Sequence, residues 1–343
     1  MNKNILITGG AGFIGHQAFK EILINTDWKI TILDRLSYAG NPRRIEEVIN
    51  DLDKDYQNRI NFLYHDLKAE FHEDIVSDLM ETNIILHIGA SSHVTRSVKN
   101  PLTFVQDNII GTFNLLEFAK KLNNLELFYY FSTDEVFGPS EENVKFSEWD
   151  RYNSKNPYSA TKAAGEELTI AYSNTYSVPA LITHCSNVYG ERQHYEKFIP
   201  NTIKKILNNQ EVIIHTDSSN TPGSRYYIHN IDLAKTILFL IQNYETVKLE
   251  ALNIQKKEPT KINITGESLV SNLEVAQLIS KNLNKKFSYK LINKDPNRPG
   301  HDIKYGLDNS LLSSLNGVYD RDFKTGITQT VNWYMNNLSW LKN

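Results

Sequence analysis

The sequence predicts an α/β protein built on a doubly wound parallel sheet, with a smaller mixed α/β lobe. Short stretches rich in apolar and β-branched residues lie at 4–8, 28–34, 60–66, 83–90, 125–133 and 179–187. Helix-like stretches such as 101–122 separate them. Strands that alternate with helices form parallel sheets with right-handed crossovers, and these sheets bind ligands at the carboxyl ends of their strands.

The alternation of strands and helices weakens after about residue 190, where turn residues become frequent. An apolar helical stretch at 230–244 is expected to pack back on the large sheet. The sequence therefore predicts an interleaved division into two domains. Residues 1–187 plus 228–252 form the sheet domain, and residues 188–227 plus 253–343 form the smaller lobe.

Composition excludes several classes of protein. The chain has 343 residues and a formal net charge of −3, which argues against nucleic acid as a partner. No apolar run reaches the roughly 20 residues that span a bilayer, and the N-terminus shows no signal-peptide pattern. Cys185 is the single cysteine, so no intramolecular disulfide can form, and a cytoplasmic location is expected. The ten histidines show no metal-ligand spacing, so no metal is predicted.

A glycine turn joins the first strand to the following helix. Gly9, Gly12 and Gly15 permit a tight turn and let a pyrophosphate approach the free N–H groups of the helix N-terminus. Glycines also serve ordinary turns, but here the strand before, the helix after and Asp34 about 20 residues on all fit a dinucleotide site. The first domain is therefore predicted to bind a dinucleotide.

Acidic residues end the second and third strands. Asp34 is placed to accept hydrogen bonds from the adenosine ribose and would repel the 2′-phosphate of NADP, so NAD is the predicted cofactor. Arg35 beside it would soften that repulsion, which leaves NADP as an alternative. Asp66 either reaches the adenine or caps a helix.

Tyr158 and Lys162 stand four residues apart, on one face of a predicted helix. A tyrosine with a pKa near 10 is a poor base at neutral pH. A nearby ammonium and a positively charged nicotinamide both favour the phenolate. The pair follows a strand that ends at Thr133, so a hydroxyl, a phenol and an amine are expected together.

These motifs resemble the extended short-chain dehydrogenase/reductase family, in which a Ser/Thr–Tyr–Lys triad handles a hydroxyl beside NAD on a Rossmann domain. "FSTDEVFG" at 131–138 adds two adjacent acids, Asp134 and Glu135, and resembles the catalytic segment of nucleotide-sugar 4,6-dehydratases. "CSNVYG" (185–190), "EKFIP" (196–200) and "RPGHD" (298–302) extend the resemblance along the chain. "YAGN" at 38–41 favours the dTDP-glucose 4,6-dehydratases over their GDP-mannose relatives.

The resemblance implies a hydro-lyase that converts dTDP-glucose to a 4-keto-6-deoxy product with tightly bound NAD. Tyr158 takes the C4 hydroxyl proton while C4 is oxidised, Thr133 hydrogen-bonds the developing carbonyl, and Lys162 holds the phenolate and the cofactor ribose. Glu135 removes the C5 proton, and Asp134 protonates the C6 hydroxyl so that it leaves as water. An ionised Glu135 is expected to raise the pKa of Asp134 and keep it protonated.

The resemblance also implies binding residues for both ligands. For NAD these are Gly9, Gly12, Phe13, Ile14, Gly15, Asp34, Arg35, Leu36, Ser37, Asp66, Leu67, Ala90, Tyr158, Lys162 and Asn187. For the nucleotide sugar, bound by the second lobe, they are Ser92, His93, Thr133, Asn187, Glu196, Lys197, Arg225, Asn263, Arg298, His301 and Tyr305. Arg225 suits a pyrophosphate because its guanidinium is a bidentate fork; a surface ion pair is the alternative.

Several residues depart from the family pattern and leave alternatives open. Ser91 stands where a glutamate is usual, Thr95 replaces an aspartate, and His184 replaces an arginine. A UDP-glucose or UDP-N-acetylglucosamine dehydratase, or a nucleotide-sugar epimerase, is therefore an alternative. A non-catalytic NAD-binding regulator is another, although the complete triad and acid pair argue against it.

The resemblance further implies a homodimer. Members of the family pair through two helices from each subunit, here 101–122 and 158–176, which would form a four-helix interface. The alternative is that the apolar residues of these helices simply cover the sheet.

Overall fold

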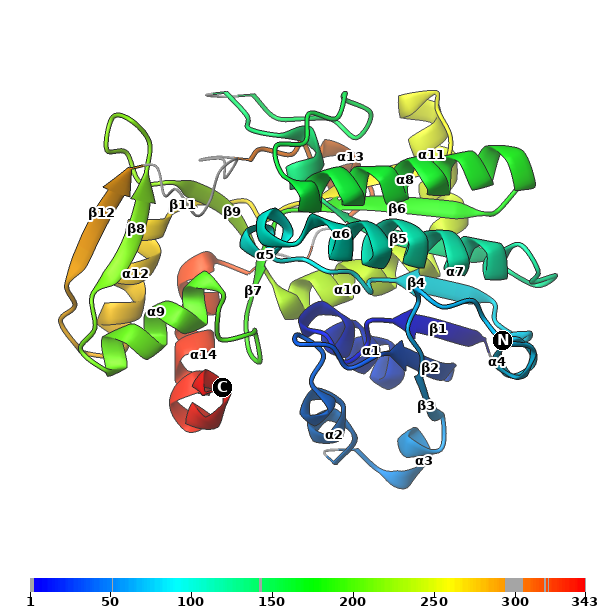
Figure 1. The fold of residues 1–343 in the computed structure, drawn as a ribbon, viewed down its shortest axis with the longest axis horizontal. Helices are drawn as coiled ribbons and strands as arrows, with labels where there is room; N and C mark the ends of the chain where they lie inside the picture. The colour runs from blue at the N-terminus through cyan, green and yellow to red at the C-terminus, as the bar shows by residue number, and fades with distance from the viewer. Residues whose placement is uncertain are drawn as a thin grey trace.

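The computed structural model describes residues 3–50, 52–141, 144–293, 305–317, 319 and 321–342. Its main sheet has seven parallel strands in the order β10-β6-β5-β4-β1-β2-β3 (Figure 1). The strands are β1 (Asn4–Thr8), β2 (Lys29–Asp34), β3 (Ile60–Tyr64), β4 (Ile84–His87), β5 (Leu127–Thr133), β6 (Ala180–Cys185) and β10 (Thr260–Ile264). The predicted doubly wound fold is confirmed, and the strand order reverses between β1 and β4, where such sheets bind ligands.

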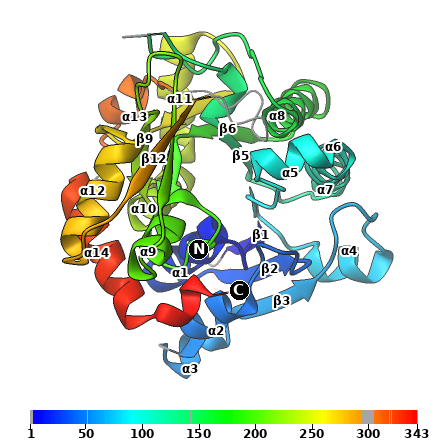
Figure 2. The same cartoon turned by 60° about the vertical axis from the view of Figure 1, so that its left-hand side comes forward.

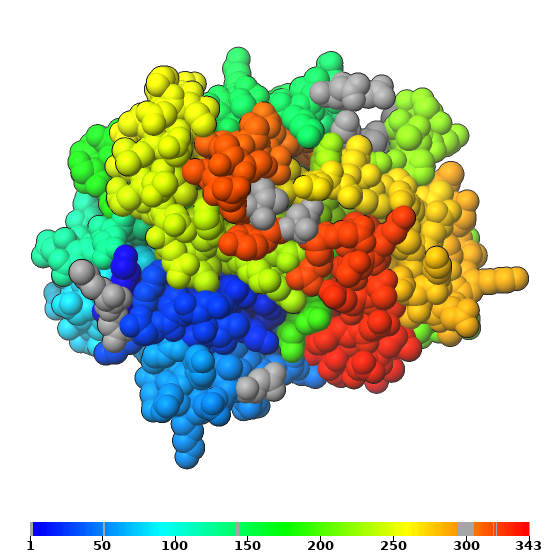
Figure 3. Space-filling view, turned by 180° about the vertical axis from the view of Figure 1, so that it is seen from behind, coloured from blue at the N-terminus to red at the C-terminus, as the bar shows by residue number. Residues whose placement is uncertain are grey.

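Helices cover both faces of this sheet. On one face lie α1 (Phe13–Asn25), α2 (Pro42–Asn50) and α10 (Asn230–Gln242), and on the other α4 (Glu73–Leu79), α7 (Gly111–Ala119) and α8 (Pro157–Tyr176). Figure 2 separates α7 and α8 from the helices on the opposite side, and Figure 3 shows α1 and α10 side by side on the rear face. The predicted apolar helix at 230–244 therefore does pack on the large sheet.

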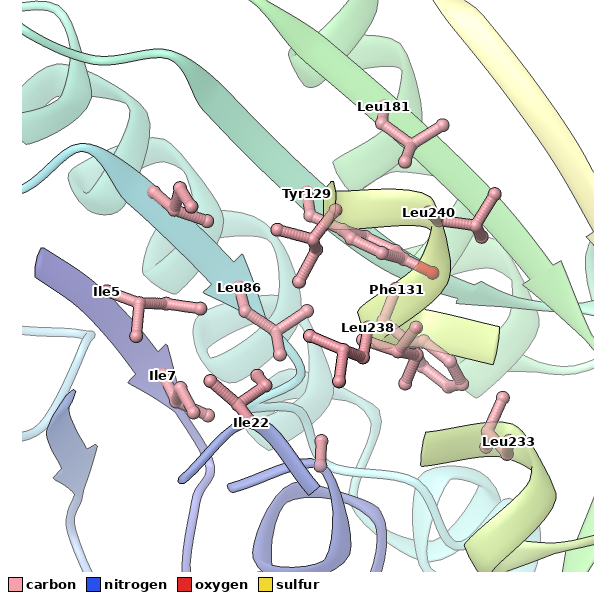
Figure 4. Close-up of a cluster of buried hydrophobic side chains, with 14 of the residues drawn as sticks. Ile5, Ile7, Ile22, Leu86, Tyr129, Phe131, Leu181, Leu233, Leu238 and Leu240 are labelled. Carbon is pink, nitrogen blue, oxygen red and sulfur yellow. The ribbon is translucent and has the colours of Figure 1, made fainter. Parts of the chain in front are cut away.

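The central strands β1, β4 and β5 are mostly apolar because both of their faces are buried. In β1, Ile5 and Ile7 belong to one hydrophobic cluster, while Leu6 belongs to the cluster on the other face. Figure 4 shows Ile22 of α1 and Leu238 of α10 directed toward these strands. This double burial fixes the carboxyl ends of the strands rigidly in space, and the site is built on those ends.

Two helical stretches expected from the sequence differ in regularity. The predicted helix at 101–122 is α6 (Pro101–Phe104), a π-helical stretch η1 (Val105–Ile110) and α7, and it follows the short α5 (Val94–Lys99). Single π turns inside helices are frequent at functional sites. By contrast, α8 is regular, and it begins with a capping box of Asn156 and Ser159 and with Pro157 in its first turn.

The smaller lobe has its own sheets and core. The strands β7 (Asn187–Tyr189), β9 (Ser224–His229) and β11 (Leu269–Ser271) form a mixed sheet, and β8 (Val212–Thr216) pairs with β12 (Tyr289–Asn293). Helices α9 (Phe198–Leu207), α12 (Asn272–Asn282) and α14 (Phe323–Asn336) pack around a separate hydrophobic cluster.

The smaller lobe exchanges elements with the sheet domain. Residues 253–343 are expected in the lobe, yet β10 is the edge strand of the main sheet, where it pairs with β6 and contacts α11 (Tyr244–Gln255) and α13 (Ser310–Ser314). The remaining short elements are α3 (Lys54–Gln57), η2 (Asp134–Phe137) and η3 (Leu338–Leu341). Within the described residues, no helix combines the length and the apolar character that a membrane crossing requires.

Candidate active site

A cavity of about 310 Å³ opens at the carboxyl ends of the strands, between the sheet domain and the smaller lobe. Its walls contain most of the residues predicted to bind the cofactor. These are Gly9, Gly12, Phe13, Ile14, Gly15, Asp34, Arg35, Ser37, Asp66, Leu67, Ala90, Tyr158, Lys162 and Asn187. Leu36 instead packs against the main core, and its backbone N–H donates to Asp34.

The glycine turn is packed too closely for side chains. Gly9 has a φ of +71°, and a Cβ atom on Gly15 would lie 2.2 Å from the carbonyl oxygen of Gly9. Gly12 is the N-cap residue of α1 and offers no side chain to its first N–H groups. Such a helix start binds an anion through those N–H groups. The turn therefore fits the pyrophosphate of a dinucleotide.

Asp34 is held at the end of β2 by two backbone N–H groups. Its carboxylate accepts hydrogen bonds from Ala11 at 3.0 Å and from Leu36 at 2.8 Å. Burial raises the pKa of Asp34, and these hydrogen bonds work in the opposite direction. Each carboxylate oxygen has a second lone pair, so Asp34 can still accept from a ribose hydroxyl.

Asp66 does not cap a helix, because α4 begins at Glu73 with His72 as its N-cap residue. Its carboxylate instead accepts from the backbone N–H of Lys68 at 3.1 Å and from the guanidinium of Arg35 at 3.2 Å. Partial burial opposes ionisation, yet these two partners hold the pKa of Asp66 below its usual range. The side chain lies at the wall expected to face the adenosine.

The opposite end of the cavity holds the acid pair. Thr133 ends β5, donates a hydrogen bond to Asp134 at 3.1 Å and accepts one from the backbone N–H of Glu135 at 3.3 Å. Both acids lie in the single turn η2, and the carboxylate of Glu135 accepts a hydrogen bond from Asn156 at 3.1 Å. No role in the site was predicted for Asn156 from the sequence, although an Asn-Pro step before a helix is typical of an N-cap.

Burial and the neighbouring charge of Glu135 raise the pKa of Asp134 to about 7, against the hydrogen bond from Thr133 and the charge of Arg225. Asp134 thus holds a proton near neutral pH, as expected for adjacent carboxyl groups.

The phenol of Tyr158 is not activated by its protein surroundings alone. Burial and the charge of Glu135 raise its pKa well above the usual range, and a hydrogen bond with Thr133 works against them. Burial lowers the pKa of Lys162 to about 7, against the charge of Glu166. The expected lowering of the Tyr158 pKa by Lys162 is therefore too small by itself to give a phenolate near neutral pH. A second positive charge near the phenol is required.

A buried polar network lies behind the catalytic lysine. The ammonium of Lys162 stands 4.1 Å from the ring centre of Tyr130, whose hydroxyl donates to the Lys162 carbonyl at 3.0 Å. One turn further along α8, the fully buried Glu166 contacts His184 at 3.0 Å and Lys261 at 3.7 Å. His184, expected from the resemblance to stand where the family has an arginine, is thus part of this network and is not among the residues that line the cavity.

The residues predicted to bind the sugar are partly brought together. Ser92, Thr133, Asn187 and Lys197 line the cavity. Arg225 is 6% exposed, stacks 4.9 Å from the ring centre of Tyr305, and lies near enough to Asp134 to lower its pKa.

The other predicted sugar-binding residues lie elsewhere. Glu196 binds Arg96 at 2.9 Å and lies 3.8 Å from His93, outside the cavity lining. Asn263 is not brought to the cavity: β10 buries it, and its side chain bonds His184 and two backbone carbonyls. Arg298 and His301 lie outside the described residues.

Asp107 lines the cavity but was not expected from the sequence. It accepts a hydrogen bond from the hydroxyl of Ser91 at 2.6 Å and binds the guanidinium of Arg35 at 2.6 Å. Ser91 is expected to stand where the family has a glutamate, so position 91 itself supplies no charge to this junction of cofactor and substrate. The π-helical stretch η1 supplies a carboxylate there, so the junction is still acidic.

Cys185 and the possible metal ligands can also be placed in the structure. Cys185 lines the cavity, and burial raises the pKa of its thiol well above the usual range, which leaves it un-ionised. No group of histidine, cysteine, aspartate and glutamate residues in the described part of the chain is arranged to hold a metal ion.

The chain matches the family model described as GDP-mannose 4,6 dehydratase over residues 6–329. It belongs to this family. A dTDP-glucose 4,6-dehydratase of Salmonella typhimurium is 32% identical over 99% of this chain and 94% of that protein. The predicted membership of the nucleotide-sugar 4,6-dehydratases is thereby confirmed.

Two further relatives differ in the substrate that their names give. The crystal structure of DesIV, a dTDP-glucose 4,6-dehydratase of Streptomyces venezuelae with NAD bound, has a TM-score of 0.85 and 27% identity, with 99% of both chains covered. A trifunctional UDP-glucose 4,6-dehydratase, 3,5-epimerase and reductase of Arabidopsis thaliana is 33% identical over 98% of this chain and 48% of that protein. Relatives of similar identity thus differ in the nucleotide of their substrate.

The raised pKa of Asp134 predicts a pH-dependent stability effect. In the unfolded chain the carboxyl ionises near pH 4, whereas in the folded chain it ionises near pH 7. The folded protein therefore loses stability progressively between about pH 4 and about pH 7, keeps the full loss above pH 7, and loses nothing below pH 4. We expect Asp134→Asn to stabilise the protein by roughly 2–4 kcal/mol at pH 8 and to have little effect at pH 4.

This gain is measured by thermal or denaturant unfolding at the two pH values. Asp78→Asn, at an exposed position of α4, makes the same charge change and should be neutral at both. Equal effects of Asp134→Asn at pH 4 and pH 8 would show that ionisation of the carboxyl is not the cause.

Proposed function

We propose that the protein is an NAD-dependent hydro-lyase that converts dTDP-glucose to dTDP-4-keto-6-deoxyglucose and water. One observation supports this above all: the Thr133–Tyr158–Lys162 triad and the acid pair share a cavity with a dinucleotide turn. The triad alone is suited to oxidation of an alcohol. Only the added acid pair, Asp134 and Glu135, is suited to the removal of water.

When bound, NAD would supply a hydride acceptor for C4 of the sugar and, once reduced, a hydride donor for C6. The glycine turn at the start of α1 holds its pyrophosphate, and Asp34 holds the adenosine ribose. Lys162, at the other end of the cavity, holds the second ribose and the phenolate of Tyr158. The reaction involves no net oxidation, so NAD ends each cycle in the form in which it began. The cofactor therefore need not leave, and the same residues can hold it through the whole cycle.

The first step is the removal of the C4 hydroxyl proton. Tyr158 is the base, and Thr133 donates a hydrogen bond to the oxygen as it becomes a carbonyl. Burial raises the pKa of the phenol, so Tyr158 works near neutral pH only beside the positive charges of Lys162 and of an oxidised nicotinamide. The site is therefore competent only when the cofactor is oxidised.

The second step is an elimination across C5 and C6. The C4 carbonyl acidifies the C5 proton, since the resulting carbanion is delocalised as an enolate, and Glu135 removes this proton. Asp134 gives its proton to the C6 hydroxyl, which leaves as water. A pKa of about 7 keeps this proton available near neutrality, and Asn156 orients the carboxylate of Glu135. Return of the hydride to C6 and of a proton to C5 completes the cycle.

A UDP-glucose 4,6-dehydratase is the second candidate. The plant relative with that activity matches nearly all of this chain. A simple epimerase is less well supported, because epimerisation needs no acid to protonate a leaving hydroxyl, and the buried Asp134 would then have no catalytic role.

For location we propose the cytoplasm, where the single cysteine, the buried Cys185, stays reduced. Cell fractionation tests this proposal.

The substrate is tested by incubating the enzyme with dTDP-glucose, UDP-glucose and UDP-N-acetylglucosamine in turn. We expect loss of one water from dTDP-glucose, seen by mass spectrometry and by the alkaline absorbance of the keto sugar. Faster turnover of a UDP sugar would move the assignment to the second candidate. A C4 epimer without dehydration would indicate an epimerase, and no product from any sugar nucleotide would indicate a regulator.

The role of Asp134 as general acid is tested by Asp134→Asn. General acids contribute about 10²–10⁴ in rate, so dehydration should fall at least about a hundredfold, while NADH formed by C4 oxidation accumulates and absorbs at longer wavelength. In the wild type, dehydration should decline above about pH 7 as Asp134 loses its proton, and the variant should lack this decline. Undiminished dehydration by Asp134→Asn would remove the proposed role.

We also propose a homodimer. Leu102, Val105, Ile110 and Phe113 are 63%, 38%, 42% and 41% exposed, and they follow one side of α6, η1 and α7. The sheet is covered by other residues of the same helices, such as Leu115 and Leu116, which are fully buried. The simpler reading, that all apolar residues here cover the sheet, therefore leaves this stripe unexplained.

A charge in the apolar stripe should separate the subunits. We expect Phe113→Glu to halve the molar mass measured by light scattering, because an interface buries this position in an apolar core. Ile24→Glu is the matched control, since Ile24 is 39% exposed and lies on α1, away from the stripe. An unchanged mass for Phe113→Glu, or a monomeric wild type, would contradict this interface.

A further inference from the structure

The guanidinium of Arg35, the residue that follows Asp34, is bound by the carboxylates of Asp66 and Asp107. The guanidinium of Arg35 donates to the two oxygens of Asp107 at 2.8 and 2.6 Å and to Asp66 at 3.2 Å. A bidentate contact of this kind has fixed geometry and is stronger than a neutral hydrogen bond. We refer to Asp66 and Asp107 around Arg35 as the carboxylate clamp.

Asp107 is fixed from several directions. Its side chain is 4% exposed and accepts the hydroxyl of Ser91 at 2.6 Å. The next residue, Asn108, is also buried: its amide bonds the backbone of Ser91 at 2.8 and 3.0 Å and the hydroxyl of Thr161 in α8 at 2.9 Å. The π-helical turn therefore holds Asp107 in one place, and Asp107 holds Arg35.

The cations near the clamp are already engaged. Asp34, Asp66 and Asp107 contribute three negative charges to this part of the cavity, and Arg35, Arg44 and Lys68 contribute three positive ones. Arg35 and Lys68 are paired with these acids, and the guanidinium of Arg44 donates to the backbone carbonyls of Ala11, Ala39 and Arg192. A guanidinium that accommodates a 2′-phosphate must be free to turn toward the ribose, and here it is bound on the side of η1.

We propose that Asp107 is a specificity-determining residue, which selects NAD over NADP by keeping Arg35 from the 2′-position of the adenosine ribose. The proposal rests on the dinucleotide site proposed above. Selection against NADP is usually assigned to the acid at the end of the second strand, here Asp34. Arg35 follows Asp34 directly, and a free guanidinium there would offset the repulsion between Asp34 and a 2′-phosphate. Selectivity then depends on η1, which lies far from β2 in the sequence.

The proposal is tested by cofactor exchange. Purified holoprotein is incubated with a large equimolar excess of NAD and NADP, desalted and denatured, and the retained dinucleotides are quantified by chromatography. We expect the wild type to retain NAD and Asp107→Asn to raise the NADP-to-NAD ratio about tenfold or more. Asp78→Asn, which removes an exposed charge of the same sign, should leave the ratio unchanged.

Two further variants separate the clamp from a simple loss of negative charge. The double variant Asp107→Asn/Arg35→Ala should return the NADP-to-NAD ratio to the wild-type value. The ratio rises in Asp107→Asn because the released guanidinium of Arg35 binds the 2′-phosphate, and the double variant lacks this guanidinium. Arg35→Lys leaves Asp107 intact but cannot form the bidentate contact, so it should raise the ratio and keeps the proposal testable if Asp107→Asn does not fold.

An unchanged ratio in both Asp107→Asn and Arg35→Lys, or a gain that persists without Arg35, would overturn the proposal. A wild type that retains neither dinucleotide would instead overturn the proposed cofactor site itself. The two failures are therefore distinguishable.

Discussion

The burial of Asp134 beside the half-buried Glu135 at the end of β5 is the constraint on which the catalytic end of the cavity depends. Asp134 is 5% exposed and follows a strand that is buried along its whole length. Two neighbouring charges in such a place repel and lack solvent, so the more buried group keeps its proton. The fold thus produces an acid and a base from two similar side chains. Catalysis by dehydration needs this asymmetry.

The same burial creates a problem that the rest of the site has to solve. It raises the pKa of Tyr158 and lowers that of Lys162, which removes the charges that oxidation requires. Glu166, one turn below Lys162, favours the ammonium, and its own pKa is lowered to about 2 by His184 and Lys261 in spite of burial. The buried His184 thus helps to retain the negative charge of Glu166.

The sequence was a good guide wherever function depends on local pattern. The strand–helix alternation predicted the fold. The local motifs predicted part of the site, and the structure places these motifs at the cavity: the glycine turn, Asp34 and the acids after Thr133. Residues that reach the site through tertiary contacts were beyond such reasoning. Asp107 lies within an apolar helix pattern, and its role depends on a π turn that no periodicity indicates. Asn263 was predicted to bind the sugar, and the sequence around it gives no sign that β10 joins the main sheet and buries its amide.

The π-helical stretch η1 connects the two ends of the cavity through hydrogen bonds. Asp107 binds Arg35 on the adenosine side, while Asn108 binds Thr161, whose hydroxyl in turn donates to the carbonyl of Tyr158 at 2.8 Å. A regular α-helix turns 100° per residue, and the wider π turn changes which side chains face the sheet. The apolar stripe on the outer side of the same helices would pack against a second subunit. Assembly and cofactor binding would then stabilise the same turn, since each holds one of its faces.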